Sequence, residues 1–169
     1  MAFVPQHVVE ATWMKAATMD TKTARALQKK SGKFQPELIG FTIGWTHKLR
    51  PDAVGLALYI MVVVFEMFRA AGVKTRKASE HSVMEHWKQS AELAAHLETT
   101  GAVPNTLSAL SLPTEEPHVL QYVIDALTEV PEDDPVELTA NEFWHLFATL
   151  KTIVDTLHDA STTSSALRD

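Results

Sequence analysis

The stretch AVGLALYIMVVVF, residues 53–65, is an unbroken apolar run, and it constrains the fold more than any other feature of the sequence. The run has thirteen residues, whereas a membrane-spanning helix needs about twenty. Charged side chains also stand close to both of its ends, with Arg50 before it and Glu66 after it. A helix that is apolar on nearly every face must be covered on every face. We therefore predict that a helix over about residues 52–71 is the buried centre of a helical bundle and does not span a membrane.

The remaining sequence carries signals of helix starts and ends. A first helix over about residues 6–30, with a possible break near Asp20, places Val9 and Trp13 at helical spacing and ends at Ser31–Gly32. Proline in a first turn and Ser or Thr at an N-cap indicate five further starts, namely Pro36, Pro51, Ser79, Thr114 and the Thr139–Glu142 capping box. No extended apolar–polar alternation indicates strands. We predict an all-α, single-domain bundle of about six helices over residues 1–160, followed by a flexible tail, 161–169.

Composition limits the cellular setting and the chemistry. The 169 residues include no cysteine, which excludes disulfides and thiolate metal sites and is compatible with a reducing cytoplasm. The start of the sequence lacks the pattern of a secretory signal, so we expect a cytoplasmic protein. The net charge of −6 is divided unevenly, because residues 1–50 carry +5 and residues 101–169 carry −10. Such a chain can dock its basic part against its acidic part, within one molecule or between two copies.

Glu66 is the one carboxylate set at the end of the apolar run, and two interpretations are open. Arg69 follows at i+3, within reach of an ion pair on a helix that is emerging towards solvent. Alternatively, Glu66 is partly buried and acts as an acid, a base or a metal ligand. We favour the ion pair, because an isolated buried charge is costly.

A carboxylate-bridged metal site is the enzyme hypothesis to test. Helical bundles hold two metal ions with lone glutamates and Glu-x-x-His motifs, and this chain offers Glu66 together with Glu142 and His145. The capping-box position of Glu142 argues against the site, because that side chain turns back to its own helix terminus. The sequence has no nucleophile elbow, phosphate-binding glycine loop or HExxH motif. We predict no metal, no cofactor and no catalytic residue.

A basic stripe marks one face of the first predicted helix, formed by Lys15, Lys22, Arg25 and Lys29. It could contact the phosphates of a nucleic acid or could simply be the solvated side of an amphipathic helix. No aromatic residue is interleaved with these basic residues, and the whole chain is acidic. A nucleic-acid accessory role is therefore only an alternative hypothesis.

The leading hypothesis is a non-catalytic, helical protein–protein interaction or regulatory protein that associates with itself as a homodimer or with another protein. It rests on the large fraction of apolar residues, the four tryptophans and the absence of a catalytic motif. The residues expected at the interface lie on or beside the apolar run and are Phe41, Trp45, Tyr59, Phe65 and Phe68.

Overall fold

The chain is an all-α bundle, as the sequence predicts. The computed structural model describes residues 2–129 and 136–162, and within them it has seven α-helices and one pair of two-residue strands. The helices are α1 (Gln6–Ala17), α2 (Thr21–Phe34), α3 (Pro36–Thr46), α4 (Pro51–Ala70), α5 (Glu80–Thr99), α6 (Pro117–Thr128) and α7 (Ala140–Ala160). The short 3₁₀ turns η1 (Pro104–Thr106) and η2 (Ala109–Ser111) lie between α5 and α6, and the strands are β1 (Lys74–Thr75) and β2 (Ser161–Thr162).

The first predicted helix is two helices. The chain breaks after α1, and Asp20 caps α2 by accepting a hydrogen bond from the backbone N–H of Thr23 at 2.7 Å. The predicted end at Ser31–Gly32 is wrong, because α2 continues to Phe34. It stops there because Pro36 follows, and a proline disfavours helical geometry at the residue before it, Gln35.

Two of the predicted N-caps are confirmed and one is wrong. Ser79 caps α5, and Thr139 and Glu142 form the reciprocal capping box of α7. Thr114 does not cap α6, since that helix begins with Pro117, one residue after an N-cap at Glu116. The hydroxyl of Thr114 instead accepts a hydrogen bond from the backbone N–H of Glu116 at 3.1 Å.

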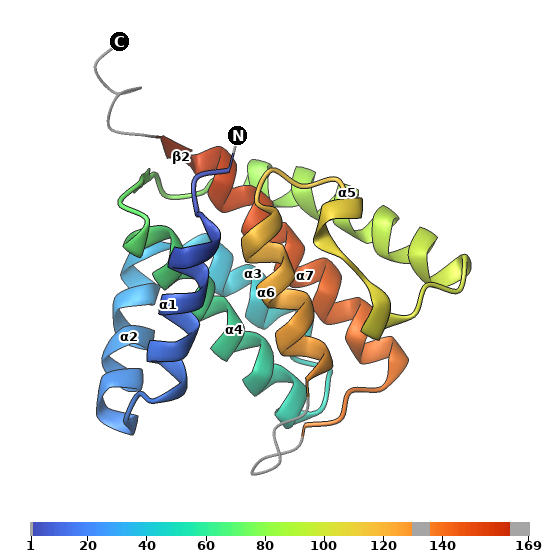
Figure 1. Cartoon of the computed structure of the whole chain (residues 1–169), viewed down its shortest axis with the longest axis horizontal. Helices are drawn as coiled ribbons and strands as arrows, with labels where there is room; N and C mark the ends of the chain where they lie inside the picture. The colour runs from blue at the N-terminus through green and yellow to red at the C-terminus, as the bar shows by residue number, and fades with distance from the viewer. Residues whose placement is uncertain (1, 130–135, 163–169) are drawn as a thin grey trace.

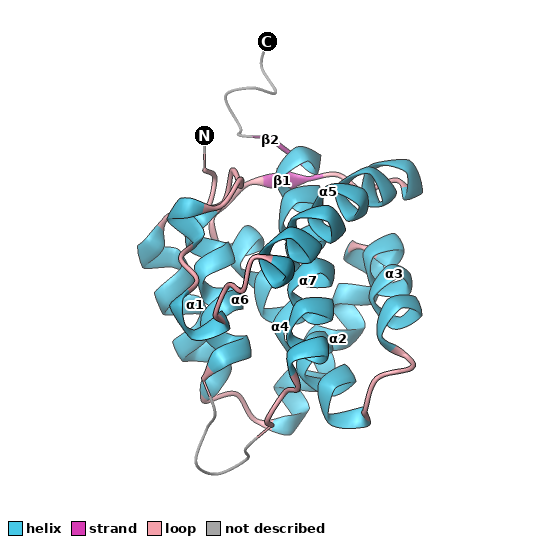
Figure 2. Ribbon diagram, turned by 90° about the vertical axis from the view of Figure 1, so that its right-hand side faces the viewer, coloured by secondary structure: helices cyan, strands magenta, loops and turns pink. Residues whose placement is uncertain are grey.

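Two helices share the centre of the bundle. Both α4 and α7 lie between α1 and α6 on one side and α3 and α5 on the other (Figures 1 and 2). Most side chains of α7 are buried, whereas α4 is buried mainly over its second half, from Ile60 to Phe68. The prediction that the 52–71 helix is covered on every face is therefore wrong for its first half, where Gly55 and Tyr59 are exposed.

Burial within the bundle covers part of the apolar run. Among the described helices, α4 alone is long and apolar enough to cross a membrane, and 56% of its most apolar window is buried inside the bundle. Its buried residues pack against α7, α3, α1 and α6, as those of a core helix do.

A small antiparallel ladder closes one end of the bundle. Lys74 pairs with Thr162, and Thr75 pairs with Ser161. The predicted tail, 161–169, thus begins with two residues that belong to β2, while residues 163–169 lie outside the described residues.

Candidate functional site

A groove of about 930 Å³ opens between α1, α4, α6 and η2, and we call it the α1/α4/α6 groove. It exists because α1 and α6 diverge above the first half of α4, where Gly55 contributes no side chain and leaves open space. Its apolar wall includes Val9, Trp13, Leu56, Tyr59, Leu110 and Tyr122. The volume lies near the upper end of the range for ligand-binding cavities in proteins.

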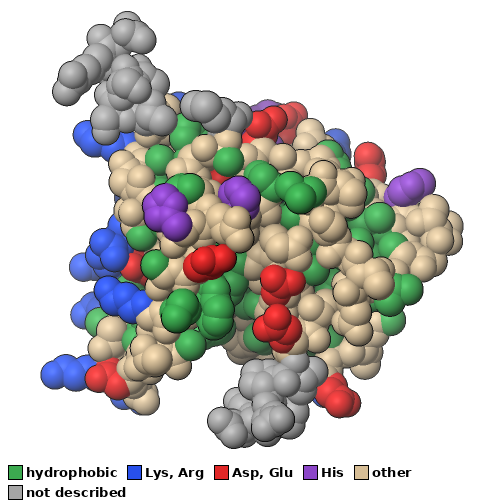
Figure 3. Space-filling view, in the orientation of Figure 1, with side chains coloured by type: hydrophobic (Ala, Val, Ile, Leu, Met, Phe, Trp, Pro, Cys, Tyr) green, Lys and Arg blue, Asp and Glu red, His purple; other side chains and the backbone are tan. Residues whose placement is uncertain are grey.

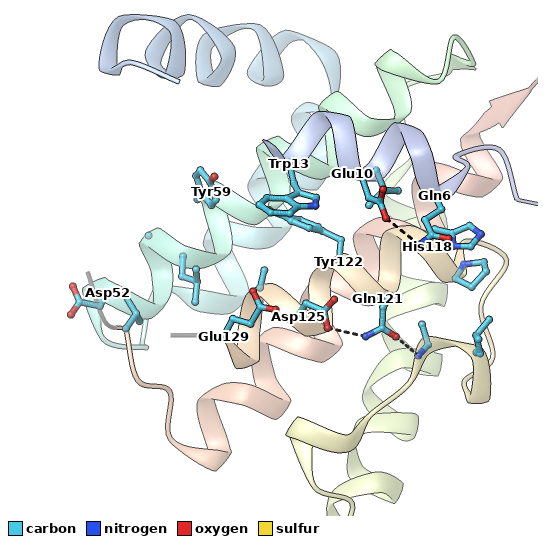
Figure 4. Close-up of a pocket in the computed structure, with 18 of the residues that line it drawn as sticks. Gln6, Glu10, Trp13, Asp52, Tyr59, His118, Gln121, Tyr122, Asp125 and Glu129 are labelled. Carbon is cyan, nitrogen blue, oxygen red and sulfur yellow. Dashed lines mark hydrogen bonds between the residues drawn. The ribbon is translucent and has the colours of Figure 1, made fainter. Parts of the chain in front are cut away.

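Three aromatic side chains from three helices converge in this groove (Figure 4). Trp13 comes from α1, Tyr59 from α4 and Tyr122 from α6. Trp13 and Tyr59 keep 44% and 46% of their surface exposed, so the groove presents two large, open aromatic side chains. Burial raises the pKa of Tyr122, and the neighbouring Tyr59 adds to the rise, so both phenols stay neutral in their apolar surroundings.

Four carboxylates surround the aromatic wall, contributed by Glu10, Asp52, Asp125 and Glu129. None of them forms an ion pair with a described lysine or arginine. Within the described residues, the side chains of Glu10 and Asp125 accept hydrogen bonds from the neutral side chains of Gln6 and Gln121, at 3.1 and 2.9 Å. No lysine or arginine is found among the described residues that line the groove, so the four carboxylates are the charged groups of the lining, apart from the titratable His118. Figure 3 shows hydrophobic and acidic side chains gathered in the middle of this face.

The residues predicted at an interface separate into three locations. Tyr59 lies in the groove, whereas Trp45 and Phe41 lie on α3, on the other side of α4 and α7 (Figure 2). Phe65 and Phe68 are 2% and 0% exposed, which corrects their predicted role. Both lie on the covered side of the second half of α4, where they belong to the core cluster, so they form core contacts and cannot reach a partner.

Trp45 belongs to an aromatic cluster between α3 and α5. Its ring lies 4.4 Å from that of Trp87, centroid to centroid, and Phe41 packs edge-on to Trp87 at 5.7 Å. His145, from α7, makes a short contact with the backbone carbonyl of Trp45. The cluster therefore fixes α3 onto α5 and α7 and leaves Trp45 partly exposed.

The glutamates considered for a metal site are each engaged elsewhere. Glu66 receives three hydrogen bonds from the guanidinium of Arg69, at 2.7 to 3.0 Å, so the predicted ion pair is confirmed. Glu142 binds Arg50, at the start of α4, sixteen residues before Glu66. At a rise of 1.5 Å per residue, that separation is about 24 Å along the helix. The fold does not bring Glu66 to Glu142 and His145, and no His, Asp or Glu cluster able to hold a metal ion occurs in residues 2–129 and 136–162.

The basic stripe is distributed over two helices, because the chain breaks between them. Lys15 lies on α1, whereas Lys22, Arg25 and Lys29 lie on one face of α2. All four side chains are exposed. Basic side chains follow the edge of the molecule over α2, beside the acidic groove (Figure 3).

Sequence reasoning missed most of the groove. Trp13 shares helical spacing with the buried Val9, but it is exposed, and the spacing does not distinguish the two. The missed residue with the clearest local signal is Leu110, which is 83% exposed in η2. A short loop rich in serine and proline contributes few side chains to a hydrophobic core. The exposure of Leu110 could therefore have been predicted from its place in the sequence.

No family model, curated protein or solved structure matches this chain, so likeness in sequence or fold assigns no function.

Proposed function

We propose that this chain is a non-catalytic interaction protein whose α1/α4/α6 groove binds an amphipathic, basic helix of a protein partner. The observation that carries the proposal is the combination of an exposed aromatic wall with four carboxylates that form no ion pair with a described lysine or arginine. Apolar contact would supply affinity, and the carboxylates would select the charge of the partner.

A helix is the form of partner that suits a groove built between helices. Helix-in-groove recognition places apolar side chains at i, i+3, i+4 and i+7 into an apolar furrow. Trp13, Tyr59 and Leu110 would contact the apolar side chains of the partner helix, because they are the most exposed large apolar residues that line the groove. Aromatic anchors with a polar rim are the usual composition of energetic centres in protein interfaces.

Lysine or arginine on the flanks of the partner helix would face the four carboxylates. Asp125 and Glu129 lie on the α6 side, opposite Trp13 (Figure 4). Asp52 lies in the first turn of α4, and Glu10 lies on α1. The carboxylates thus come from all three helices of the groove, so a basic residue on either flank of the partner finds an opposite charge.

We also propose that the protein acts in the cytoplasm and associates with itself, the latter through the α3 surface. Trp45 and Ile43 are both exposed on α3, and Trp45 is already held by Trp87. A pre-oriented aromatic side chain loses little entropy when a second copy covers it. Sedimentation equilibrium at micromolar concentration tests this second function, and a strictly monomeric mass would refute it.

The groove is tested with a synthetic amphipathic leucine–lysine helix that carries a fluorescent label. Anisotropy should report binding, and the matching leucine–glutamate helix should not bind. Trp13→Ala and Tyr59→Ala should each weaken binding by about tenfold or more. Trp45→Ala is the matched control, because it removes an aromatic residue of similar exposure that lies outside the groove.

Gly55→Leu supplies a test that does not remove contacts. A leucine side chain there would occupy open space at the bottom of the groove and block the partner. Gly40→Leu is its control, because it fills equally open space in the helical part of α3. Both changes remove a helical glycine and should stabilise the fold by roughly 0.5–1 kcal/mol. Equal binding by wild type, Gly55→Leu and Trp13→Ala would refute the groove proposal.

A further inference from the structure

The aromatic residues of the α1/α4/α6 groove differ from the other tryptophans of the chain. Those three tryptophans each pack against neighbouring aromatic rings. Trp13, Tyr59 and Tyr122 make no ring contact with any residue in 2–129 or 136–162. No described residue forms a hydrogen bond with the indole N–H of Trp13 or with either phenol. Aromatic side chains from three helices therefore meet in one groove without engaging one another.

Each helix of the groove places a carboxylate on the same face as its aromatic residue. Residues three or seven positions apart lie on one face of a helix. The pairs at these spacings are Glu10 with Trp13, Asp52 with Tyr59, and Asp125 with Tyr122. Figure 4 shows Asp125 below the rings of Trp13 and Tyr122. A ligand in contact with the aromatic side chains is therefore surrounded by negative charges.

This combination favours a cation as the ligand. The face of an indole or phenol ring attracts a cation, and tryptophan does so most strongly. The described lining of the groove supplies no lysine or arginine to these rings. His118 also lines the groove, but it lies at the Gln6 end, away from Tyr59 (Figure 4). The ligand therefore has to bring the positive charge.

The aromatic wall favours an alkylated ammonium over the ammonium of an ordinary lysine. A lysine ammonium has three N–H donors, and each donor that loses its water needs an acceptor. Trp13 offers no acceptor, and Tyr59 and Tyr122 offer only their phenol oxygens. A trimethylated ammonium keeps the charge, has no N–H donor and presents methyl groups to the rings. An ordinary lysine gains more from the carboxylates at the edge of the groove.

We propose that the aromatic side chains of the groove bind a trimethylated lysine of the partner helix. This inference rests on the proposed function, because the lysine belongs to the helix that the groove binds. Trp13 and Tyr59 contact the methyl groups, and Asp125 faces the charge. Gly55 leaves open space one turn before Tyr59, where a side chain of this size fits. The cation–π contribution strengthens binding by about two- to thirtyfold, depending on how far the cation is desolvated.

The test uses the labelled leucine–lysine helix with one central leucine replaced. Three replacements are compared by anisotropy against the full chain: lysine, trimethyllysine, and the neutral tert-butyl isostere in which carbon takes the place of the nitrogen. The trimethyllysine helix should bind at least about threefold more tightly than each of the other two. The isostere has the same shape, so its difference from trimethyllysine measures the charge alone.

Trp13→Leu tests the aromatic face itself, because leucine keeps an apolar side chain but has no ring. This variant should bring the affinities for trimethyllysine and for the isostere to within about twofold of each other. Trp45→Leu is the matched control, since Trp45 has similar exposure and lies outside the groove, and it should leave the preference unchanged.

The outcomes separate this inference from the proposed function. Equal binding of the trimethyllysine and isostere helices would overturn the inference, while binding of the unmodified leucine–lysine helix would still support the groove. If no helix binds, both fail. Tighter binding of the lysine helix than of the trimethyllysine helix would overturn the role of methylation. Tetramethylammonium that binds as tightly as the trimethyllysine helix would overturn the role of the partner helix.

Discussion

The guanidinium of Arg50 binds both carboxylate oxygens of Glu142, at 2.9 and 2.7 Å. Arg50 is the N-cap of α4 and Glu142 lies in the first turn of α7, so this bidentate pair joins the starts of the two central helices. The Glu142 carboxylate also accepts the backbone N–H of Thr139 at 2.9 Å. One side chain therefore serves a helix cap and a contact between helices.

Glu142→Gln should destabilise the protein near neutral pH by about 1–3 kcal/mol, because glutamine can still cap α7 but cannot form the charged pair. The hydrogen bonds from Arg50 hold the pKa of Glu142 at about 2, and those from Thr139 act in the same direction. Since this pKa is lower in the folded state, the stabilisation is present above about pH 4.5 and is lost as the pH falls towards 2. Urea unfolding of both proteins across this pH range measures the effect. Glu137→Gln is the control, and a pH-independent difference would contradict the prediction.

Gln35→Leu should cost about 2 kcal/mol or more, although it replaces a polar residue by an apolar one. The Gln35 side chain is fully buried and donates to the carbonyl of Arg76 at 2.8 Å. It also accepts from the backbone N–H of Ala78 at 2.9 Å, and leucine would leave both backbone groups unpaired. Urea unfolding gives the cost, and hydrogen exchange at the Ala78 amide should accelerate. The exposed Gln28→Leu is the control, and equal stability of the two variants would contradict this role.

Tyr122 should ionise at a much higher pH than a free phenol does. Tyr59 should ionise at a lower pH than Tyr122. Burial raises the pKa of both groups, with a larger effect at Tyr122. Because the raised pKa belongs to the folded state, this stabilisation is complete below about pH 10 and is lost at higher pH. The chain has only two tyrosines, so absorbance of tyrosinate resolves them, and Tyr122→Phe should remove the later step. If both tyrosines instead ionised in a single step at the pKa of a free phenol, the prediction would be contradicted, because the phenols would then be hydrated.

Glu66→Gln should change stability by only about 0.2–0.5 kcal/mol, as expected for an i, i+3 ion pair near solvent. Arg69, its partner, is 53% exposed, so water and salt weaken the attraction. Thermal unfolding at low and high salt measures the difference, which should shrink as salt is added. A loss above about 2 kcal/mol would instead indicate a buried, functional carboxylate.

Local signals predicted much of the helical pattern but few of the site residues. The capping box of α7 and the prolines that begin α3 and α4 depend only on residues that are close in the sequence, so these helix starts could be predicted from the sequence. Trp13 shows the limit of this reading. Its spacing places it on the same face as Val9, but α6 reaches only part of that face and leaves the indole open.

The sequence by itself determined that the chain is helical, that residues 53–65 lie in one apolar helix and that Glu66 pairs with Arg69, because these outcomes depend on hydrophobic periodicity and on residues three or four positions apart. Only the tertiary structure decided that α7 shares the centre and that Phe65 is buried while Tyr59 is exposed. It also brought Trp13 to Tyr122, and His158 to Glu116. These relationships arise where separate helices diverge or meet, and helix packing angles are set by the whole set of interlocking side chains rather than by any one segment.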